Sequence, residues 1–419
     1  MQLFKQGVAL PFQKGRTLER GVEQLAVTQV RLPVAAGDDN APMPQLTATT
    51  VTAGDELCRN DGTPVVAPIT GTIEGTVLID HPLYGPLRCV DITAAEEQGE
   101  EHRLSVPAEE DLTPEAILRI AQEAAIYDEL DGIPLWEKLE QWCLPADDPA
   151  ALHSILVADA TENDVFGSAA WAVVMDQPKL VLFGLQMAAK AIRFSRYHIA
   201  TMLPKRRRRT LKRAVGRVKV FTVDDEYPVT TFANPDLEVY RIGVQACLAL
   251  GRALKQGLRH TAAIVTVAGD ALPAPRNLQV PFGTPISAML AACQVEYRHQ
   301  ILLGDAMVGL HCTDPSAPLL PGITTVLAMH PKRTHIPGPC IGCGRCAEVC
   351  HADLLPYEIV RLSENMHYER LQQLSPQECD GCAACSYVCP AHRDVAADVL
   401  RAGQSEGTLF LTWEEDDYE

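Results

Sequence analysis

The chain has 419 residues, 47% hydrophobic and 21% charged, with a formal net charge of −18; this excludes a disordered chain and predicts two to four folded domains. The acidic balance argues against a nucleic-acid partner, because phosphate binding needs a basic surface. No apolar run approaches the roughly 18–20 residues that span a bilayer, and Met1–Gly15 lacks the features of a signal peptide. A cytoplasmic location is therefore expected, with a peripheral position at the inner face of the membrane left open.

The first predicted domain, residues 1–94, is a tail followed by a β domain. Residues 44–93 are rich in Thr, Val, Gly and Pro in short alternating runs, which is typical of β-strands. Turns at Gly54-Asp55 and at Thr70-Gly71 would fold these strands into a small sandwich of hairpins. No lysine stands in the hairpin position that carries biotin or lipoate, so a swinging-arm role is disfavoured.

A second predicted domain, residues 110–260, follows the acidic and polar segment 95–112. Thr113 followed by Pro114 predicts a helix N-cap. Beyond it, helical stretches alternate with short apolar strands, which predicts a Rossmann-like α/β domain with a parallel sheet. Examples are strand Ser154–Ala158, helix Lys179–Ile192, and strands Ile199–Leu203 and Val218–Val223.

A dense basic run, Lys205 to Arg209 with Lys212 and Arg213, interrupts this acidic chain. Pro204 predicts that the run opens a helix, where the helix dipole disfavours positive charge. The simplest interpretation is a solvated helix face. The alternative hypothesis is a docking site for an acidic redox partner or an anion, which would explain why positive charge is kept at an unfavourable position in the helix.

The third predicted domain, residues 261–335, returns to β character. Ala263–Asp270 reads as a strand and turn, and Phe282–Pro285 as a turn leading into a helix at Ile286–Cys293. This pattern predicts a small β-grasp-like module. A fourth predicted domain, 336–400, holds most of the cysteines and ends in a helix at Val395–Leu400, and the acidic tail 401–419 is expected to be solvated.

Eight of the fourteen cysteines lie between Cys340 and Cys389, in two runs spaced C-x2-C-x2-C-x3-C. Each cysteine of the second run lies 39 residues after its counterpart in the first, which indicates an internal duplication. In a cytoplasmic chain such clusters are not expected to be disulfides. Three thiolates three residues apart can hold three irons of one cubane, while the fourth cysteine ligates the other cluster.

The spacing therefore predicts a ferredoxin-like domain with two 4Fe–4S clusters. Cluster I is assigned to Cys340, Cys343, Cys346 and Cys389, and cluster II to Cys379, Cys382, Cys385 and Cys350. Paired zinc sites are the rival interpretation, but zinc ligands usually come in two pairs a dozen or more residues apart. Pro390 follows the second run, whereas His351 stands at the corresponding place in the first. A ligand role for His351 is not expected, because four thiolates per cluster are already present.

The other cysteines are scattered and are expected to act as small buried hydrophobes: Cys58, Cys89, Cys143, Cys247, Cys293 and Cys312. The His, Ser and Asp residues form no recognisable triad, so no catalytic residue is assigned.

The order of these segments resembles the RnfC (RsxC) subunits of Rnf electron-transport complexes, over about residues 30–400. Pro64–Ile73 resembles the family's barrel-sandwich, and Val265–Pro285 its soluble-ligand-binding β-grasp (SLBB) module. Leu302–Gly309 resembles a glycine and methionine turn just after that module, and the paired cysteine runs close the match. The resemblance implies a domain like the 51 kDa subunit of complex I, which binds FMN and accepts electrons from NADH.

Three segments depart from that family. Its phosphate-cradling loop, G-x-G-G-A-G-F-P-T, is matched here by Ala125–Leu135, which keeps Gly132 but carries Asp128, Glu129 and Asp131. Glycines are needed there because a Cβ blocks the approach of backbone to phosphate. The flavin-lining segment N-A-A-E-C-E-P-Y survives only as Asp159–Phe166, with Glu162 and Asp164, and the third segment begins with Glu226-Tyr227-Pro228 but lacks the glycines that follow.

The sequence thus predicts an RnfC-like electron relay that has lost NADH binding, and FMN is not expected. Asp128, Gly132 and Glu162 mark the degenerate FMN/NADH region. Expected partners are redox proteins: a reductase, a flavoprotein or Rnf-type membrane subunits; soluble carriers of the PrdC type are one model. An active FMN-dependent NADH-oxidising subunit of an Rnf-type complex is one alternative. A structural subunit whose clusters only stabilise the fold is the other.

Overall fold

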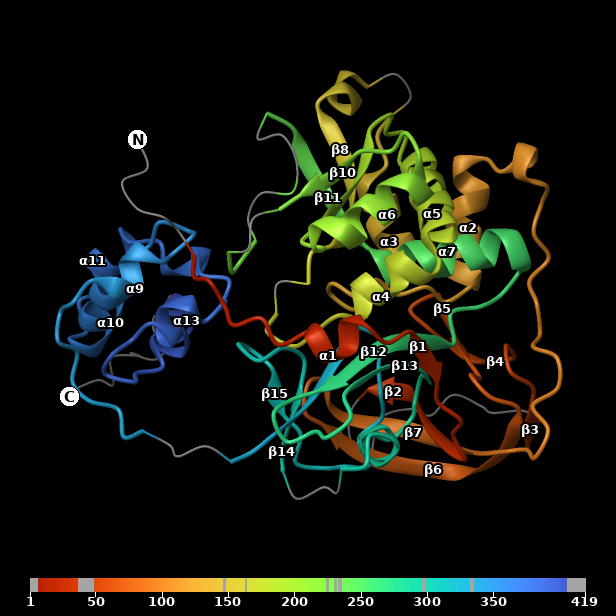
Figure 1. Cartoon of the computed structure of the whole chain (residues 1–419), viewed down its shortest axis with the longest axis horizontal. Helices are drawn as coiled ribbons and strands as arrows, with labels where there is room; N and C mark the ends of the chain where they lie inside the picture. The colour runs from red at the N-terminus through yellow and green to blue at the C-terminus, as the bar shows by residue number, and fades with distance from the viewer. Residues whose placement is uncertain are drawn as a thin grey trace, which may run out of the picture. The chain divides into compact units, whose positions relative to one another are not determined.

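The computed structural model describes residues 7–36, 49–145, 148–162, 164–223, 226–229, 232, 236–295, 299–331 and 335–404 (Figure 1). It forms two compact units. The larger comprises Phe12–Asp224 and Thr231–Pro331, and the smaller comprises Met1–Pro11, Asp225–Thr230 and Lys332–Glu419. The acidic tail beyond residue 404 lies outside the described ranges. No helix within those ranges is both long and apolar enough to cross a bilayer.

The amino-terminal part of the larger unit is built from antiparallel strands, as predicted for residues 44–93. One sheet has the order β2-β7-β6-β3, and β4 and β5 form a separate hairpin. The short helix α1 (Gly15–Leu18) precedes them. The strands are β2 (Gln29–Ala36), β3 (Thr50–Val51), β4 (Glu56–Asn60), β5 (Thr63–Val66), β6 (Gly71–His81) and β7 (Gly85–Ala94). The predicted turn at Gly54 is present, with Gly54 at φ +90.

A second sheet confirms the predicted parallel α/β arrangement. Its order is β10-β9-β8-β11 and all three pairings are parallel. The strands are β8 (Ser154–Ala160), β9 (Tyr197–Thr201), β10 (Val220–Thr222) and β11 (Glu238–Gly243). The helices around it are α2 (Pro114–Glu123), α3 (Leu135–Trp142), α4 (Ala169–Asp176), α5 (Pro178–Ala191), α6 (Lys205–Val215) and α7 (Val244–Gln256), with 3-10 turns at Glu109–Asp111 and Pro149–Leu152. Thr113 caps α2 as predicted, since its hydroxyl accepts from the Ala116 N–H at 3.2 Å.

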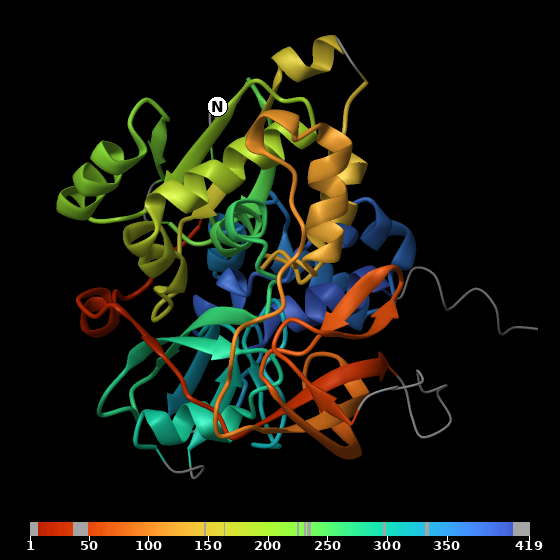
Figure 2. The same ribbon diagram turned by 90° about the vertical axis from the view of Figure 1, so that its right-hand side faces the viewer.

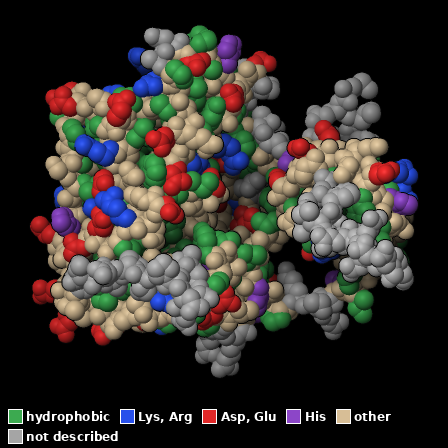
Figure 3. Space-filling model, turned by 180° about the vertical axis from the view of Figure 1, so that it is seen from behind, with side chains coloured by type: hydrophobic (Ala, Val, Ile, Leu, Met, Phe, Trp, Pro, Cys, Tyr) green, Lys and Arg blue, Asp and Glu red, His purple; other side chains and the backbone are tan. Residues whose placement is uncertain are grey.

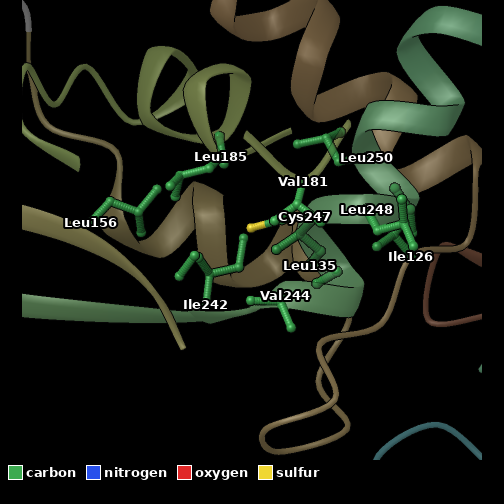
Figure 4. Packing of buried hydrophobic residues seen from close by; sticks show 14 of the residues in the cluster. Ile126, Leu135, Leu156, Val181, Leu185, Ile242, Val244, Cys247, Leu248 and Leu250 are labelled. Carbon is green, nitrogen blue, oxygen red and sulfur yellow. The ribbon is translucent and has the colours of Figure 1, made fainter. Parts of the chain in front are cut away.

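Helices α5 and α7 pack closely because two glycines remove side chains from their contact. A Cβ at Gly184 would lie 1.8 Å from the carbonyl oxygen of Cys247, and one at Gly251 would lie 2.5 Å from that of Leu180. Figure 4 shows the Cys247 side chain among Val181, Leu135 and Ile242 in this core. Cys247 therefore acts as a small hydrophobe, as do the buried Cys89, Cys293 and Cys312, whereas Cys58 and Cys143 are only half-buried.

The third sheet of the larger unit holds residues predicted as β-grasp-like. Its order is β1-β13-β12-β16-β14-β15. The strands are β1 (Val22–Gln24), β12 (Ala262–Ala268), β13 (Arg276–Pro281), β14 (Gln300–Leu303), β15 (Leu310–His311) and β16 (Thr325–Met329), with helix α8 at Ile286–Ala292. Strand β1 comes from the amino-terminal tail and pairs in parallel with β13 (Figure 2). The barrel-sandwich and SLBB identities, and the domain boundaries, stay predictions.

The smaller unit consists of short helices around the cysteine runs. They are α9 (Arg345–Glu348), α10 (Pro356–Glu364), α11 (Tyr368–Gln372), α12 (Ala384–Tyr387) and α13 (Val395–Gln404), with a 3-10 turn at Pro376–Glu378. The first residues of α9 and α12, and of α10 and α13, are separated by the same 39 residues as the cysteines. The duplication therefore extends from the cysteine runs to the helix that follows each of them.

Candidate iron–sulfur centre and nucleotide loop

The two cysteine runs share one backbone conformation. Left-handed residues stand at Gly342 and Gly381 (φ 67 and 77) and at Gly344 and Ala383 (φ 77 and 61). Left-handed residues in short loops can turn backbone N–H groups toward a common centre, which favours an anionic group there. Ala383 adopts this conformation although its Cβ disfavours it. The strain at Ala383 is consistent with a binding loop, since such strain is common at functional sites.

The four cysteines assigned to cluster I line one pocket. Its volume is about 510 Å³, and its wall includes Cys340, Cys343 and Cys346 together with Cys389 from the second run. Backbone of Gly342 and Gly344 and side chains of α10 complete the wall. Four sulfur donors around one pocket are the donor set that a 4Fe–4S cluster requires, so the residues present fit the group.

The four cysteines assigned to cluster II also come together. Burial raises the pKa of Cys379, and the neighbouring Cys350 adds to the rise. Burial likewise raises the pKa of Cys382 to about 12, with Asp380 and Cys350 contributing, and that of Cys385 to about 12, with Cys382 and Cys379 contributing. Cys350 thus lies beside cysteines of the second run. Thiols must lose their protons to bind iron, so binding here is coupled to proton release.

His351, which stands where the second run has proline, connects the two runs. Its Nε2 lies 2.9 Å from Oδ2 of Asp380, one of the two residues between Cys379 and Cys382. The backbone N–H of Cys382 donates to the other Asp380 oxygen at 3.1 Å. The ligand atoms of His351, Asp380 and Cys382 lie within 4.8 Å of one another, a grouping that could hold a metal ion. With Cys382 assigned to cluster II, His351 and Asp380 form the polar boundary of that centre.

The acidic loop at the position of the family's nucleotide loop is folded into the protein. Asp128 is fully buried, and its carboxylate pairs with Nζ of Lys138 at 2.5 Å and accepts from the Gly243 N–H at 3.0 Å. Asp131 pairs with the same lysine at 2.8 Å. Gly132 keeps a left-handed conformation, φ +74. The carboxylates are therefore partnered inside the chain rather than left to repel a ligand in solution.

Glu129 occupies the amino terminus of α7. Its carboxylate accepts from the backbone N–H groups of Gln245 at 2.6 Å and Ala246 at 2.9 Å. These N–H groups carry the positive end of the helix dipole, the place where a phosphate would bind. A Cβ at Gly243 would lie 2.1 Å from the Glu129 carboxyl carbon, so this approach requires a glycine. The protein's own carboxyl group thus takes the position of an external anion.

The second degenerate segment, Asp159–Phe166, forms part of the wall of a pocket of about 420 Å³. Five carboxyl groups and one guanidinium line this pocket: Glu129, Asp159, Glu162, Asp164, Asp305 and Arg241. Glu162 accepts a hydrogen bond from the backbone N–H of Ala170, at the start of α4. Burial raises its pKa to about 7, and Lys14 opposes the rise. Arg241 is held by Asp159 at 2.5 Å. The structure therefore brings Glu162 to one pocket with Glu129, while Asp128 and Gly132 lie outside its wall.

Sequence reasoning missed three residues of this region. Glu129 was noted only as one charge of the loop, and Lys138 and Arg241 were not singled out. The Gly243-Val244 start of α7 is the one sequence signal for the cap, but nothing local pairs it with Glu129, 116 positions away from Gln245. Tyr227-Pro228 of the third segment belongs to the smaller unit, where Tyr227 exchanges backbone hydrogen bonds with Val8.

Comparison with known proteins gives one domain match and several relatives. Residues 339–392 match the 4Fe–4S dicluster domain. The chain is similar to the C subunit of the ion-translocating oxidoreductase complex of Rhodobacter capsulatus, with 34% identity over 30% of this chain and 25% of the relative. It is similar to the protein of that name in Vibrio cholerae, with 25% identity over 74% and 43%. The C subunit of the Na(+)-translocating ferredoxin:NAD(+) oxidoreductase complex of Acetobacterium woodii is 24% identical over 63% and 64%.

The chain thus spans less than two thirds of the length of each of these relatives. Among solved structures, an NAD+-reducing NiFe hydrogenase in the H2-reduced state matches with a TM-score of 0.42 and 14% identity, over 70% of this chain and 60% of the other. The relatives and the domain match confirm the resemblance to RnfC-type subunits, with a 4Fe–4S domain near the carboxyl end.

Proposed function

We propose that this RnfC-like chain relays electrons between redox partners through two 4Fe–4S clusters and does not itself oxidise NADH. The observation that carries the proposal is the pocket lined by three cysteines of one run and the fourth of the other. When bound, each cluster supplies one-electron storage. Eight thiolates of the chain would hold the two clusters, and backbone N–H groups of the two cysteine loops would point toward them.

The proposed loss of NADH and FMN binding rests on Glu129. A phosphate at the α7 amino terminus would have to displace a buried carboxylate that already accepts two backbone hydrogen bonds. The wall of the adjoining pocket carries three further carboxyl groups, those of Asp159, Glu162 and Asp164, and one guanidinium, that of Arg241. A dianionic phosphate gains nothing from an anion site that is filled and surrounded by carboxylates.

An anaerobic absorption spectrum of the purified chain tests both parts of the proposal. The iron content should approach eight per chain, and a broad cluster absorption should bleach with dithionite but not with NADH. Flavin bands, or bleaching by NADH alone, would instead establish an active FMN-dependent NADH-oxidising subunit. Clusters that resist dithionite would indicate a purely structural role.

Helix α6 is the proposed docking surface for an acidic redox partner. It carries seven cationic residues, confirming that the basic run opens a helix behind Pro204. Within the described ranges none of the seven forms an ion pair, and five of them, Lys205, Arg206, Arg209, Lys212 and Arg213, are exposed. On the face of the larger unit drawn in Figure 3, by contrast, basic and acidic side chains are interspersed. An uncompensated cationic helix attracts an acidic protein and speeds its association.

The docking proposal is tested by reducing the holo-protein and following electron transfer to an acidic flavodoxin. The rate should fall as ionic strength rises. Arg206→Glu with Arg209→Glu should lower the rate and weaken its salt dependence. Lys190→Glu with Arg196→Glu changes the net charge equally at exposed positions outside α6 and serves as the control. Equal salt dependence in the two double variants would refute docking at α6.

A further inference from the structure

A separate pocket of the larger unit carries charged groups that neither the clusters nor the nucleotide loop uses. Its volume is about 300 Å³. The wall is formed by the carboxyl-terminal half of α7, the segment Leu258–Ala262 that follows it, and Glu101 from the segment that links the β domain to α2. The charged residues are Glu101, Arg252 and Arg259.

Glu101 is held in the wall by its neighbours' backbone. The N–H of His102 donates to Ala53 O at 2.7 Å on one side, and the N–H of Leu104 donates to Gly257 O at 2.8 Å on the other. A Cβ at Gly257 would lie 2.5 Å from the Leu104 carbonyl oxygen, so the close approach depends on that left-handed glycine after α7. The segment described from the sequence only as acidic and polar is therefore fixed against α7.

The floor of the pocket is also fixed. The side-chain amide of Gln245 donates to Ile264 O at 2.9 Å and accepts from Ile264 N–H at 2.6 Å. Both polar atoms of Gln245 are thus occupied, and apolar groups of Leu248, Ala249 and Leu258 adjoin it. A rigid floor with charged groups around it is typical of a small-molecule site.

Two charged side chains of the wall, Glu101 and Arg259, each have a buried atom without a hydrogen bond within the described ranges. Oε1 of Glu101 and Nη1 of Arg259 are buried, and neither has a hydrogen-bond partner in the described part of the chain. Nη1 of Arg259 forms an ion pair with Glu56 Oε2 at 3.8 Å, a distance too long for a hydrogen bond. Arg252 makes no ion pair to any residue in those ranges; burial lowers its pKa, and the charges of Asp176 and Glu101 oppose the change. An unsatisfied buried polar atom costs roughly 1–3 kcal/mol unless a ligand or water satisfies it.

We propose that this pocket binds a small zwitterion, specifically a free α-amino acid. The guanidinium groups of Arg252 and Arg259 would receive its carboxylate, because the fork of N–H donors matches a carboxylate. Glu101 would accept hydrogen bonds from its ammonium group. The volume suits a ligand at the small end of the usual range, about 300–1,000 Å³. The proposal is independent of the electron relay and of the state of the nucleotide loop.

Differential scanning fluorimetry of the full-length holo-protein tests the proposal. Each standard L-α-amino acid is added at about 5 mM, since a ligand that binds only the folded state raises the melting temperature. At least one amino acid should raise the melting temperature. Its N-acetyl derivative, which lacks the ammonium group, and its amide derivative, which lacks the carboxylate, should not. No shift with any of the amino acids would overturn the proposal.

Variants then locate the site. By isothermal titration calorimetry with the amino acid that shifts the melting temperature most, Arg252→Gln and Glu101→Gln should each weaken binding by at least about tenfold. Arg217→Gln removes an exposed guanidinium outside the pocket and should leave binding unchanged. Both pocket variants should keep the far-ultraviolet circular dichroism spectrum of the native chain, which shows that the larger unit still folds. Unweakened binding in them would place the ligand elsewhere and overturn the proposal.

Discussion

Replacing Glu129 with alanine tests the carboxylate that caps α7. The substitution removes the acceptor of two hydrogen bonds and leaves the N–H groups of Gln245 and Ala246 buried without a partner. Each unsatisfied buried group costs about 1–3 kcal/mol, and loss of an N-cap costs about 0.5–2 kcal/mol. Since these contributions overlap and water can enter the space, we expect a net loss of about 3 kcal/mol of unfolding free energy.

Differential scanning calorimetry under anaerobic conditions measures this loss. The larger unit has roughly 300 residues. With an unfolding entropy of about 2.1 cal/mol/K per residue, a loss of about 3 kcal/mol lowers its melting temperature by about 5 °C. Glu140→Ala removes an exposed carboxylate from α3 and should change stability by less than about 0.5 kcal/mol. If the Glu129→Ala variant had the same melting temperature as the Glu140→Ala control, the capping role of Glu129 would be refuted, and with it the filled anion site.

The same residue predicts a pH dependence. Burial raises the pKa of Glu129 from 4.5 to about 8, and Asp128 adds to the rise. Between these values the folded chain holds a proton that the unfolded chain has released, so Glu129 makes stability fall as pH rises through that window. The side-chain amide of the Glu129→Gln variant does not titrate in this pH range. Urea unfolding at several pH values should show that the free energy of unfolding of the variant rises relative to that of the native chain from about pH 5 to 8. A difference that does not change with pH would contradict the raised pKa of Glu129.

Four further substitutions test other parts of the structure. Cys350→Ser should alter the electron paramagnetic resonance signal of the cluster held by the second run, and Cys389→Ser that of the first; effects confined to each cysteine's own run would contradict the crossed assignment. Lys138→Met leaves Asp128 buried without its cation and should cost about 3–5 kcal/mol in thermal unfolding, whereas a neutral result would show that the pair is dispensable. Gly184→Ala forces α5 away from α7 and should lower the free energy of unfolding by about 3 kcal/mol in thermal unfolding. A neutral result would show that the two helices separate easily.

The sequence by itself determined those features whose physical cause is local. The spacing of the cysteine runs predicted the 4Fe–4S domain, because ligands of one cubane must lie within a few residues on a loop. Alternating helices and apolar strands predicted the parallel sheet of β8 to β11, since a parallel connection needs a crossover helix. Thr113-Pro114 predicted the start of α2, because helix capping involves only neighbouring residues.

Only the tertiary structure decided which distant residues meet. In the sequence Glu129 was only one of three acidic residues of the loop, whereas in the fold its side chain accepts two backbone hydrogen bonds at the amino terminus of α7. Strand β1 joined a sheet formed by residues more than two hundred positions later, and Glu101 came to face Arg252 and Arg259. Composition and periodicity report how a segment partitions between water and core. They carry no information about which buried groups share a site, because that depends on the packing of elements far apart in the chain.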